Sequence, residues 1–430
     1  MAVLVATPVL LEMIITGTGG DIFAISLGSL TIRPADPGTV GLLIGILYHG
    51  RSEMSRLLGR QPGGTVLKVL LLFLGLKIAA TITLDRALIA SNALSNGLGG
   101  GLVAAIGEVR DSFLGLLVPV YVIVAGRRLV ASQMIKPFAV AVAVIFFKAI
   151  LLVATGKALI WGGDLTGTEQ DRFISSSEAI TLLLFAFVFF FVPAAKGKRP
   201  TTRVLAWVAV GVSLLANHRS VWLAGLLGMV TLVWLAVAGR LAMSKRRRIQ
   251  LACLFAGSVV AVAVLLMHHG SEMSPASNAT GINTRLLALT DPANDPTSSW
   301  RMQLWQSRLE QTQDDWAFGR VLGDRPLTMM NGALIGVPDH SAYISGFEIG
   351  GVCLTAIVIA FWGVLTREGI KTTATPGLSY PSGAVALAII AASVGYGVAY
   401  DFPLIGPALA TMLLLRRRVV VAQIRQTECA

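Results

Sequence analysis

The residues best suited to chemistry gather in one polar block, residues 296–351, of an otherwise apolar chain. The first half of this block has a helical period, with Ser298 or Ser299 as a candidate N-cap and Arg301 in the first turn. A guanidinium there could hold a phosphate, because the free backbone N–H groups and the helix dipole already favour an anion. The alternative is a surface helix at a membrane interface, with its arginines in water.

The same helical period predicts how the side chains of this segment are distributed. Met302, Trp305 and Leu309 form an apolar stripe, and Arg301, Trp305 and Arg308 fall near one face. Trp305 could stack on a sugar ring. We favour the other interpretation of the aromatic residues here, which is a belt at the membrane–water boundary.

Two further ionisable residues lie beside apolar segments. Arg219 falls in a connection of a few residues between two such segments, where it could bind an anion or simply anchor the helix ends. His340 shortly precedes another apolar segment, and Asp339, Glu348 or another carboxylate could orient it for proton transfer near neutral pH. A capping or hydrogen-bonding role is the alternative for this histidine.

Metal and nucleophile motifs are missing from the sequence. His268 and His269 are adjacent rather than four residues apart, and the three cysteines form no CxxC or Cys/His spacing. A P-loop and a GxSxG motif are also absent. We therefore expect no metal site and no cofactor.

The composition indicates a membrane protein with many spans. The chain has 430 residues, of which 54% are hydrophobic and 13% charged, whereas soluble domains carry roughly 25% charged residues. The net charge of +12 is concentrated in short clusters between apolar segments. That distribution follows the positive-inside rule, so we expect the lipid bilayer, and not a nucleic acid, as the partner of the basic residues.

Twelve apolar segments predict an all-α integral membrane protein with about twelve transmembrane helices. Six basic clusters fall in alternate connections, and all lie on one side if the N-terminus and the C-terminus are cytoplasmic. The clusters are Arg51/Arg56/Arg60, Arg127/Arg128/Lys136, Lys196/Lys198/Arg199/Arg203, Arg240/Lys245/Arg246/Arg247/Arg248, Arg367/Lys371 and Arg416/Arg417/Arg418/Arg425. The segments are 3–20, 37–50, 64–84, 112–126, 137–156, 178–193, 203–217, 220–238, 249–267, 343–365, 383–400 and 402–415.

We treat residues 1–430 as a single membrane domain. Its most distinctive part is residues 268–341, a long loop on the outer side between the ninth and tenth segments, in which we expect short helices. The beginning of this loop is rich in Ser, Asn, Pro and Gly and is predicted to be irregular. Loops of this length are usually functional or mobile.

Together, the candidate residues suit one class of reaction, the transfer of a glycosyl group from a lipid diphosphate. Arg219 and Arg301 would stabilise the negative charge that develops on the departing diphosphate. His340 would accept or orient the proton of an acceptor hydroxyl. In such a site the arginines take the electrostatic role that a metal ion plays elsewhere.

This layout resembles the bacterial O-antigen ligase and O-antigen polymerase family. Members have about twelve spans, a long periplasmic loop between the ninth and tenth, and a loop signature of Arg and Trp, a Gly-rich turn, and a His before the next helix. Residues 301–305, 318–323, 340–343 and 348–351 are similar to that signature. Residues 217–220 resemble the family's Arg at the outer start of a helix.

The sequence departs from the family pattern at two places in the loop. Ser341 follows the histidine where the family usually has Asn, which affects a side-chain hydrogen bond near the acceptor. Ala317-Phe318 stands where a Pro is common before the Gly-rich turn, which affects only the loop shape.

The resemblance implies a metal-independent, inverting glycosyltransferase of the inner membrane, acting in surface polysaccharide biosynthesis. Its donor would be an undecaprenyl-diphosphate-linked glycan, and its acceptor a lipid core (ligase) or a second glycan (polymerase). It implies catalytic roles for Arg219, Arg301 and His340. The candidate substrate-binding residues are Arg308, Arg320, Trp305 and Tyr343.

The alternative function is a transporter or flippase of a lipid-linked or anionic saccharide. Transporters are expected to carry charges within their spans and paired broken helices. Lys77 and Lys148 are the charges well inside the predicted spans, and neither has an obvious acidic partner in the sequence. We interpret both as lysines that extend toward the membrane surface.

Overall fold

In the computed structural model, six of the twelve predicted segments fall within the residues that the structure describes. Those residues are 25–27, 30–32, 63–92, 176–191, 199–215, 218–240, 296–322, 328–330, 333–335, 341–373 and 382–398, with a few isolated positions elsewhere. Apart from isolated positions, the predicted segments 3–20, 37–50, 112–126, 137–156, 249–267 and 402–415 lie outside the described residues.

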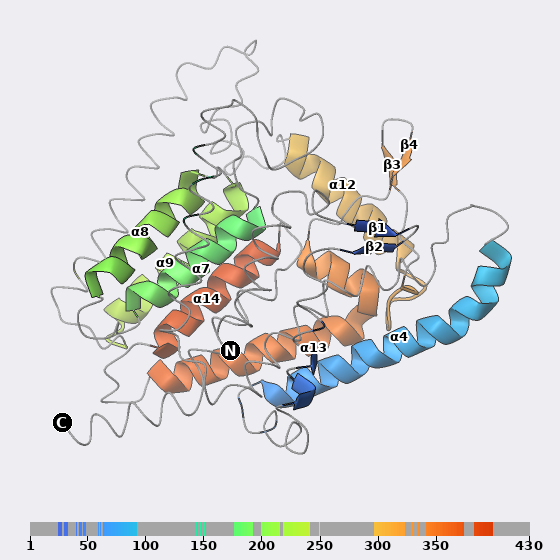
Figure 1. The fold of residues 1–430 in the computed structure, drawn as a ribbon, viewed down its shortest axis with the longest axis horizontal. Helices are drawn as coiled ribbons and strands as arrows, with labels where there is room; N and C mark the ends of the chain where they lie inside the picture. The colour runs from blue at the N-terminus through green and yellow to red at the C-terminus, as the bar shows by residue number, and fades with distance from the viewer. Residues whose placement is uncertain are drawn as a thin grey trace, which may run out of the picture.

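The described part of the chain is mainly helical (Figure 1). Two antiparallel hairpins accompany the helices, β1 (Ile25–Leu27) with β2 (Leu30–Ile32) and β3 (Thr328–Met330) with β4 (Ala333–Ile335). The helices are α4 (Gly64–Asn92), α7 (Ser176–Phe191), α8 (Arg199–Leu215), α9 (Arg219–Val237), α12 (Pro296–Gln311), α13 (Ala342–Thr373) and α14 (Ser382–Gly397).

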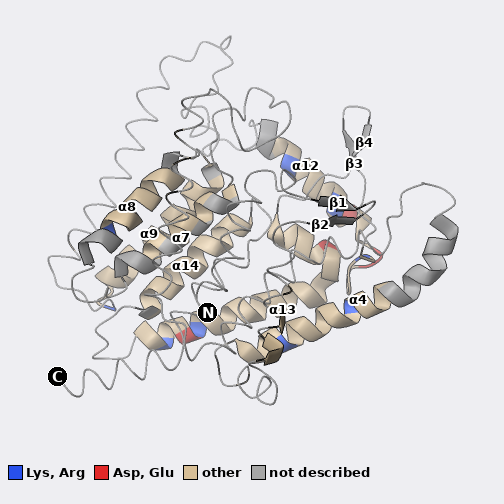
Figure 2. Cartoon of the chain, viewed as in Figure 1, with Lys and Arg blue, Asp and Glu red and all other residues tan. Residues whose placement is uncertain are grey.

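Three of these helices are long and apolar enough to cross a membrane: Gly64–Thr81 in α4, Ser220–Val237 in α9 and Ala342–Thr373 in α13. Two shorter apolar helical stretches are Arg203–Ser213 and Gly383–Gly397. Charged residues are sparse along these helices (Figure 2). The chain is therefore a possible integral membrane protein with three candidate spans among the described residues.

Small residues let α9 pack closely between α7 and α14. A Cβ added at Gly228 would lie 2.9 Å from the ring of Phe187 and 3.2 Å from the carbonyl oxygen of Ala388. A Cβ at Gly395 would lie 2.3 Å from Leu227. Helices in a membrane gain stability mainly from such close contacts, because lipid is as apolar as their side chains. The contacts also show that α9 and α14 run antiparallel.

Helix α14 also forms an antiparallel pair with α13. At one end, the Ser341 Oγ donates to the carbonyl of Gly397 at 3.4 Å, and the Tyr343 hydroxyl donates to the carbonyl of Val394 at 2.8 Å. At the other end, a Cβ on Gly383 would lie 2.5 Å from the carbonyl oxygen of Gly369. The two helices are therefore in contact at both ends of α14.

Helix α4 lies antiparallel to α13 on the other side (Figure 1). A Cβ at Gly63, just before α4, would lie 3.0 Å from the ring of Phe361. Further along α4, Ile78 packs against Leu322, which follows α12 and also contacts Ile349 of α13. Helix α13 is thus in contact with α4 and α14.

The structure corrects three predicted boundaries. Helix α4 continues to Asn92, eight residues beyond the predicted segment 64–84, because leaving an apolar environment does not itself end a helix and no Gly or Pro interrupts residues 85–92. Arg199 and Arg203 lie inside α8, and Arg367 and Lys371 lie inside α13, where connections were predicted. The basic residues therefore mark helix ends.

The hairpin β3–β4 is a further correction, because only short helices were expected in the long outer loop. Met330 pairs with Ala333, and Asn331-Gly332 stands between them in the sequence. Asn-Gly is the strongest short-range signal for a two-residue hairpin, so this element was readable from the sequence.

Candidate functional site

Helix α12 begins at Pro296, so Arg301 lies in its second turn and not in the predicted first turn. Proline is favoured at the first position of a helix, and the preceding Asp295 is a residue type favoured as N-cap. The free N–H groups at the start of the helix are therefore those of residues near Pro296. The predicted placement of Arg301 in the first turn is therefore wrong, and its role in binding a phosphate stays a prediction.

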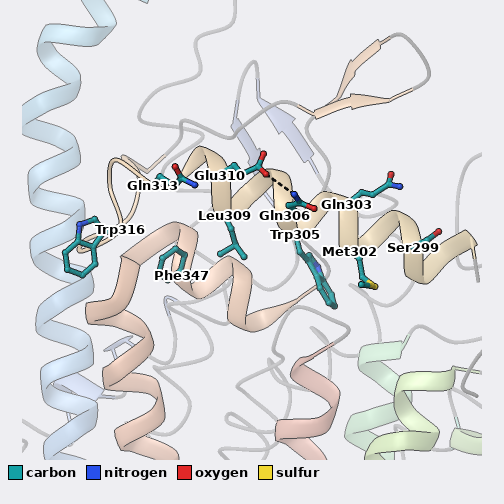
Figure 3. A pocket seen from close by; sticks show the side chains of 10 residues that line it. All are labelled: Ser299, Met302, Gln303, Trp305, Gln306, Leu309, Glu310, Gln313, Trp316 and Phe347. Atoms are coloured by element: carbon teal, nitrogen blue, oxygen red, sulfur yellow. Dashed lines mark hydrogen bonds between the residues drawn. The ribbon is translucent and has the colours of Figure 1, made fainter. Parts of the chain in front are cut away.

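One face of α12 forms a wall of an open groove of about 890 Å³. Figure 3 shows Met302, Trp305 and Leu309 pointing from α12 to the side where Phe347 of α13 lies. The apolar stripe predicted for this helix is thereby confirmed. The other lining residues are Ser299, Gln303, Gln306, Glu310, Gln313 and Trp316.

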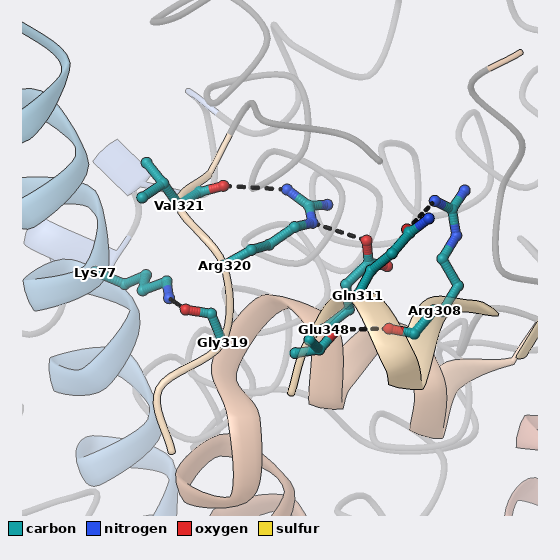
Figure 4. Close-up of polar contacts among 8 residues, drawn as sticks. Lys77, Arg308, Gln311, Gly319, Arg320, Val321 and Glu348 are labelled. Atoms are coloured by element: carbon teal, nitrogen blue, oxygen red, sulfur yellow. Dashed lines mark hydrogen bonds and ion pairs between the residues drawn. The ribbon is translucent and has the colours of Figure 1, made fainter. Parts of the chain in front are cut away.

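The arginines of α12 do not line this groove. Arg308 is 2% exposed and shares its buried face with Leu304 and Thr312. Its Nη1 donates to Gln311 Oε1 at 3.3 Å, and its carbonyl accepts from Thr312 Oγ1 at 2.7 Å (Figure 4). Arg301 is half-buried. Of the five predicted site residues whose side chains the structure describes, Trp305 alone is among the residues that line the groove.

Arg320 and Glu348 form a buried ion pair instead of contacting the groove. The Arg320 Nε donates to Glu348 Oε1 at 2.8 Å, and the side chains are 13% and 3% exposed. The Arg320 Nη1 donates to the carbonyl of Val321 at 3.2 Å (Figure 4). Glu348, one of the carboxylates considered for orienting His340, is therefore bound to Arg320.

Helix α13 is broken at Gly351, whose φ of 60° and ψ of −157° are not helical. Beyond the break, the N–H groups of Val352 and Cys353 donate to the carbonyls of Trp316 (2.9 Å) and Ala317 (3.2 Å). Before it, the carbonyl of Glu348 accepts from the N–H of Arg320 at 2.9 Å. These bonds satisfy backbone groups that a broken helix would otherwise leave unpaired.

Glycine is required on both sides of this contact. Gly319 has φ +70° and a Cβ there would lie 2.5 Å from the Glu348 carbonyl oxygen and the Gly350 nitrogen. A Cβ on Gly351 would lie 2.5 Å from the carbonyl oxygens of Trp316 and Ala317. Residues 316–320 thus pack directly against residues 348–353 of α13. We call this the loop–helix contact.

Lys77 of α4 completes the loop–helix contact. Its Nζ donates to the carbonyl of Phe318 at 2.5 Å. It also donates to the carbonyl of Gly319 at 2.9 Å (Figure 4). Lys77 thus has main-chain partners more than 240 residues away in the sequence. The interpretation of this lysine as one that only extends toward the membrane surface is wrong.

The beginnings of α9 and α13 meet the same end of α14. In α9, Ala224 lies beside Gly395, and Ser341, just before α13, donates to the carbonyl of Gly397. His218 precedes α9 and is buried. Arg219 is the first residue of α9, but its side chain lies outside the described residues, as does the whole of His340.

Tyr343, a predicted substrate-binding residue, connects two helices. Its hydroxyl is bonded to the carbonyl of Val394 in α14. A second tyrosine at this end, Tyr396, donates to Ser176 Oγ of α7 at 3.0 Å. Two tyrosine hydroxyls therefore connect α7, α13 and α14 at the start of α13 and the end of α14.

Sequence reasoning missed Phe347 as part of the groove wall, and it missed the ion pair of Glu348 with Arg320. The signal available was the Gly319, Gly350 and Gly351 set, since glycines permit a close backbone approach. Among the described residues, no group of three or more His, Cys, Asp or Glu could hold a metal ion.

Comparisons with known proteins add no family assignment. No protein-family model matches the chain, and no curated protein matches it significantly.

Proposed function

We propose that this chain is a polytopic glycosyltransferase of the bacterial inner membrane, of the O-antigen ligase or polymerase type. Its donor is an undecaprenyl-diphosphate-linked glycan on the outer side of the membrane. The acceptor is a hydroxyl of a lipid core or of a second lipid-linked glycan. The motifs of residues 217–220 and 301–351 are the basis of this proposal.

The observation that best supports the proposal is the meeting of the starts of α9 and α13 at one end of α14. Arg219 opens α9, and His340 directly precedes Ser341, whose side chain is bonded to Gly397 of α14. A cationic side chain and a proton acceptor at neighbouring helix ends suit a diphosphate leaving group and an acceptor hydroxyl. Helix α12, which carries Arg301, contacts α13.

The proposed reaction is a single displacement. The acceptor oxygen forms a bond to the anomeric carbon as the bond from that carbon to the diphosphate oxygen breaks. The electron pair of the broken bond goes to the diphosphate, whose added charge Arg219 and Arg301 stabilise. The acceptor proton goes to His340. The anomeric configuration inverts because attack and departure occur on opposite faces.

The directions of the helices agree with the proposed arrangement of twelve spans. Helices α4, α8 and α14 correspond to the third, seventh and eleventh predicted segments, and α7, α9 and α13 to the sixth, eighth and tenth. The antiparallel pairs α7–α8, α9–α14, α13–α14 and α4–α13 each combine an odd with an even segment. Successive membrane crossings require this alternation, whichever side of the membrane the N-terminus lies on.

The proposal is tested with purified protein in detergent and a synthetic undecaprenyl-diphosphate oligosaccharide, with products resolved by mass. Wild-type protein should make lengthened glycans if it is a polymerase, or should glycosylate an added lipid core if it is a ligase. The His340→Ala variant should do neither. A donor that stays intact with both acceptors would contradict the proposal.

Replacing Arg219 by alanine should lower the transfer rate by roughly 10²–10³, the usual effect of removing one group that stabilises transition-state charge. Arg240→Ala is the matched control, because Arg240 is exposed beyond the opposite end of α9. Both variants should reach near-normal abundance in the membrane. Equal transfer rates for the two variants would remove Arg219 from the mechanism.

Transport of an anionic saccharide is the second candidate, and the break in α13 favours it specifically. Broken helices and buried charges such as Glu348 within a span are typical of transporters. The two functions differ in their need for a sealed compartment. Saccharide accumulation in sealed vesicles, without release of undecaprenyl diphosphate, would support transport; release of undecaprenyl diphosphate in detergent would support transfer.

A further inference from the structure

Lys77 lies within the apolar stretch Gly64–Thr81 of α4, where a charged side chain is costly. Its ammonium group is bonded to the two consecutive carbonyls of Phe318 and Gly319. Such a cost is tolerated when the charge has partners or a task. The acceptors are backbone atoms of the turn that follows α12, so the charge of Lys77 acts directly on the position of that turn.

The turn is held from three directions. The Arg320–Glu348 ion pair and the hydrogen bonds from Arg320, Val352 and Cys353 fix it on α13. The side chain of Leu322, 3% exposed, packs against Ile349 of α13 and against Ile78, the residue next to Lys77. The two bonds from Lys77 attach it to α4. The loop–helix contact therefore joins α4 and α13 through a segment of the outer loop.

The same contact sets the distance between two walls of the groove. Trp316 lines the groove with its side chain, and its carbonyl accepts the N–H of Val352. Phe347 lines the groove from α13 and precedes Glu348, the partner of Arg320. Any shift of residues 316–320 relative to residues 348–353 would consequently move Trp316 relative to Phe347.

We propose that Lys77 is a positioning residue for the groove. By holding the carbonyls of Phe318 and Gly319, its ammonium group keeps the loop–helix contact closed and fixes the Trp316 wall against the Phe347 wall. Lys77 does not itself line the groove. This role does not depend on which molecule the groove binds. It can therefore be tested separately from the glycosyltransferase proposal.

Hydrogen–deuterium exchange of the purified full-length protein in detergent tests this role without any substrate. The amides to follow are those of Arg320, Val352 and Cys353, whose hydrogen bonds form the loop–helix contact. Lys77→Met keeps an unbranched side chain and removes the donor. It should accelerate exchange of these three amides roughly tenfold, the factor expected for the loss of a hydrogen bond from a charged donor. Amides in α9 and α14 should exchange at the wild-type rate.

Two further variants separate positioning from simple packing. Lys77→Arg keeps a charged donor and should restore slow exchange. Lys68→Met removes a lysine from the same helix, nine residues from Lys77, and should leave the three amides unchanged. If Lys77→Met does not fold, Lys77→Gln, with a shorter neutral donor, replaces it, and intermediate exchange is expected. Wild-type exchange rates in folded Lys77→Met, or unprotected amides in the wild-type protein, would overturn the proposal.

Discussion

Gly319→Ala is expected to lower the free energy of unfolding by about 2–5 kcal/mol, from a left-handed backbone penalty and a steric overlap. Gly319 has φ +70°, and the new Cβ would lie 2.5 Å from backbone atoms of Glu348 and Gly350, which cannot move aside as a flexible side chain can. The loss should appear as a lower midpoint of thermal or denaturant unfolding in detergent.

Gly75→Ala is the matched control for this substitution. Gly75 lies inside α4, and a Cβ there would meet nothing within 4 Å. Alanine is favoured over glycine in a helix by roughly 0.5–1 kcal/mol, so this variant should be as stable as wild type or slightly more stable. A Gly319→Ala protein as stable as Gly75→Ala would contradict the close approach of the turn to α13.

Glu348→Ala is expected to destabilise the protein by about 3–5 kcal/mol, because it leaves the largely buried guanidinium of Arg320 without its carboxylate. Replacing both partners, with Glu348→Ala and Arg320→Met together, should cost less than Glu348→Ala alone, since no buried charge then stays uncompensated. The free energy of unfolding in detergent should be measured for the wild type, Glu348→Ala and the double variant under the same conditions.

Glu368→Ala serves as the control for the ion pair. Glu368 and Lys371 pair at 2.9 Å on the surface of α13, with side chains 23% and 56% exposed. Such an exposed pair contributes about 0–1 kcal/mol. If Glu348→Ala were no more destabilising than Glu368→Ala, the Arg320–Glu348 pair would not be a buried structural contact.

Within the described residues, the sequence predicted a helix best where the helix coincides with an apolar segment. The segments 178–193 and 220–238 correspond to α7 and α9 within two residues at each end. Boundaries failed where polar residues continued a helix, as after Leu84 in α4. The apolar stripe of α12 was predictable because the 3.6-residue period alone determines which side chains share a face.

The break in α13 and the partners of Lys77 were not predictable from local pattern. Gly350-Gly351 lies inside an apolar run and is a pair at which a helix can break. Whether it breaks depends on another segment that supplies acceptors for the freed N–H groups. Here the acceptors are carbonyls of Trp316 and Ala317. A search for an acidic partner of Lys77 could not succeed, since its partners are backbone carbonyls, which every residue type has.

The candidate site was predicted as a set of residue types, and only part of its geometry follows from the sequence. Arg308 and Arg320 were grouped with the substrate because both are cations in the outer loop. The structure buries Arg308 on the face of α12 away from the groove and pairs Arg320 with Glu348. This burial depends on which face of α12 packs against the rest of the protein. The helical period of the sequence does not determine that packing.

Binding of undecaprenyl diphosphate, the proposed leaving group, tests most directly whether the ends of α9 and α13 hold a lipid diphosphate. This probe requires no knowledge of the sugar or the acceptor. Titration of the purified protein should show saturable binding, tighter than for undecaprenyl monophosphate, which offers fewer oxygens to two arginines. Arg219→Ala should weaken binding of the diphosphate, and Arg240→Ala should not. Absence of binding, or equal binding by wild type and Arg219→Ala, would contradict the proposed site.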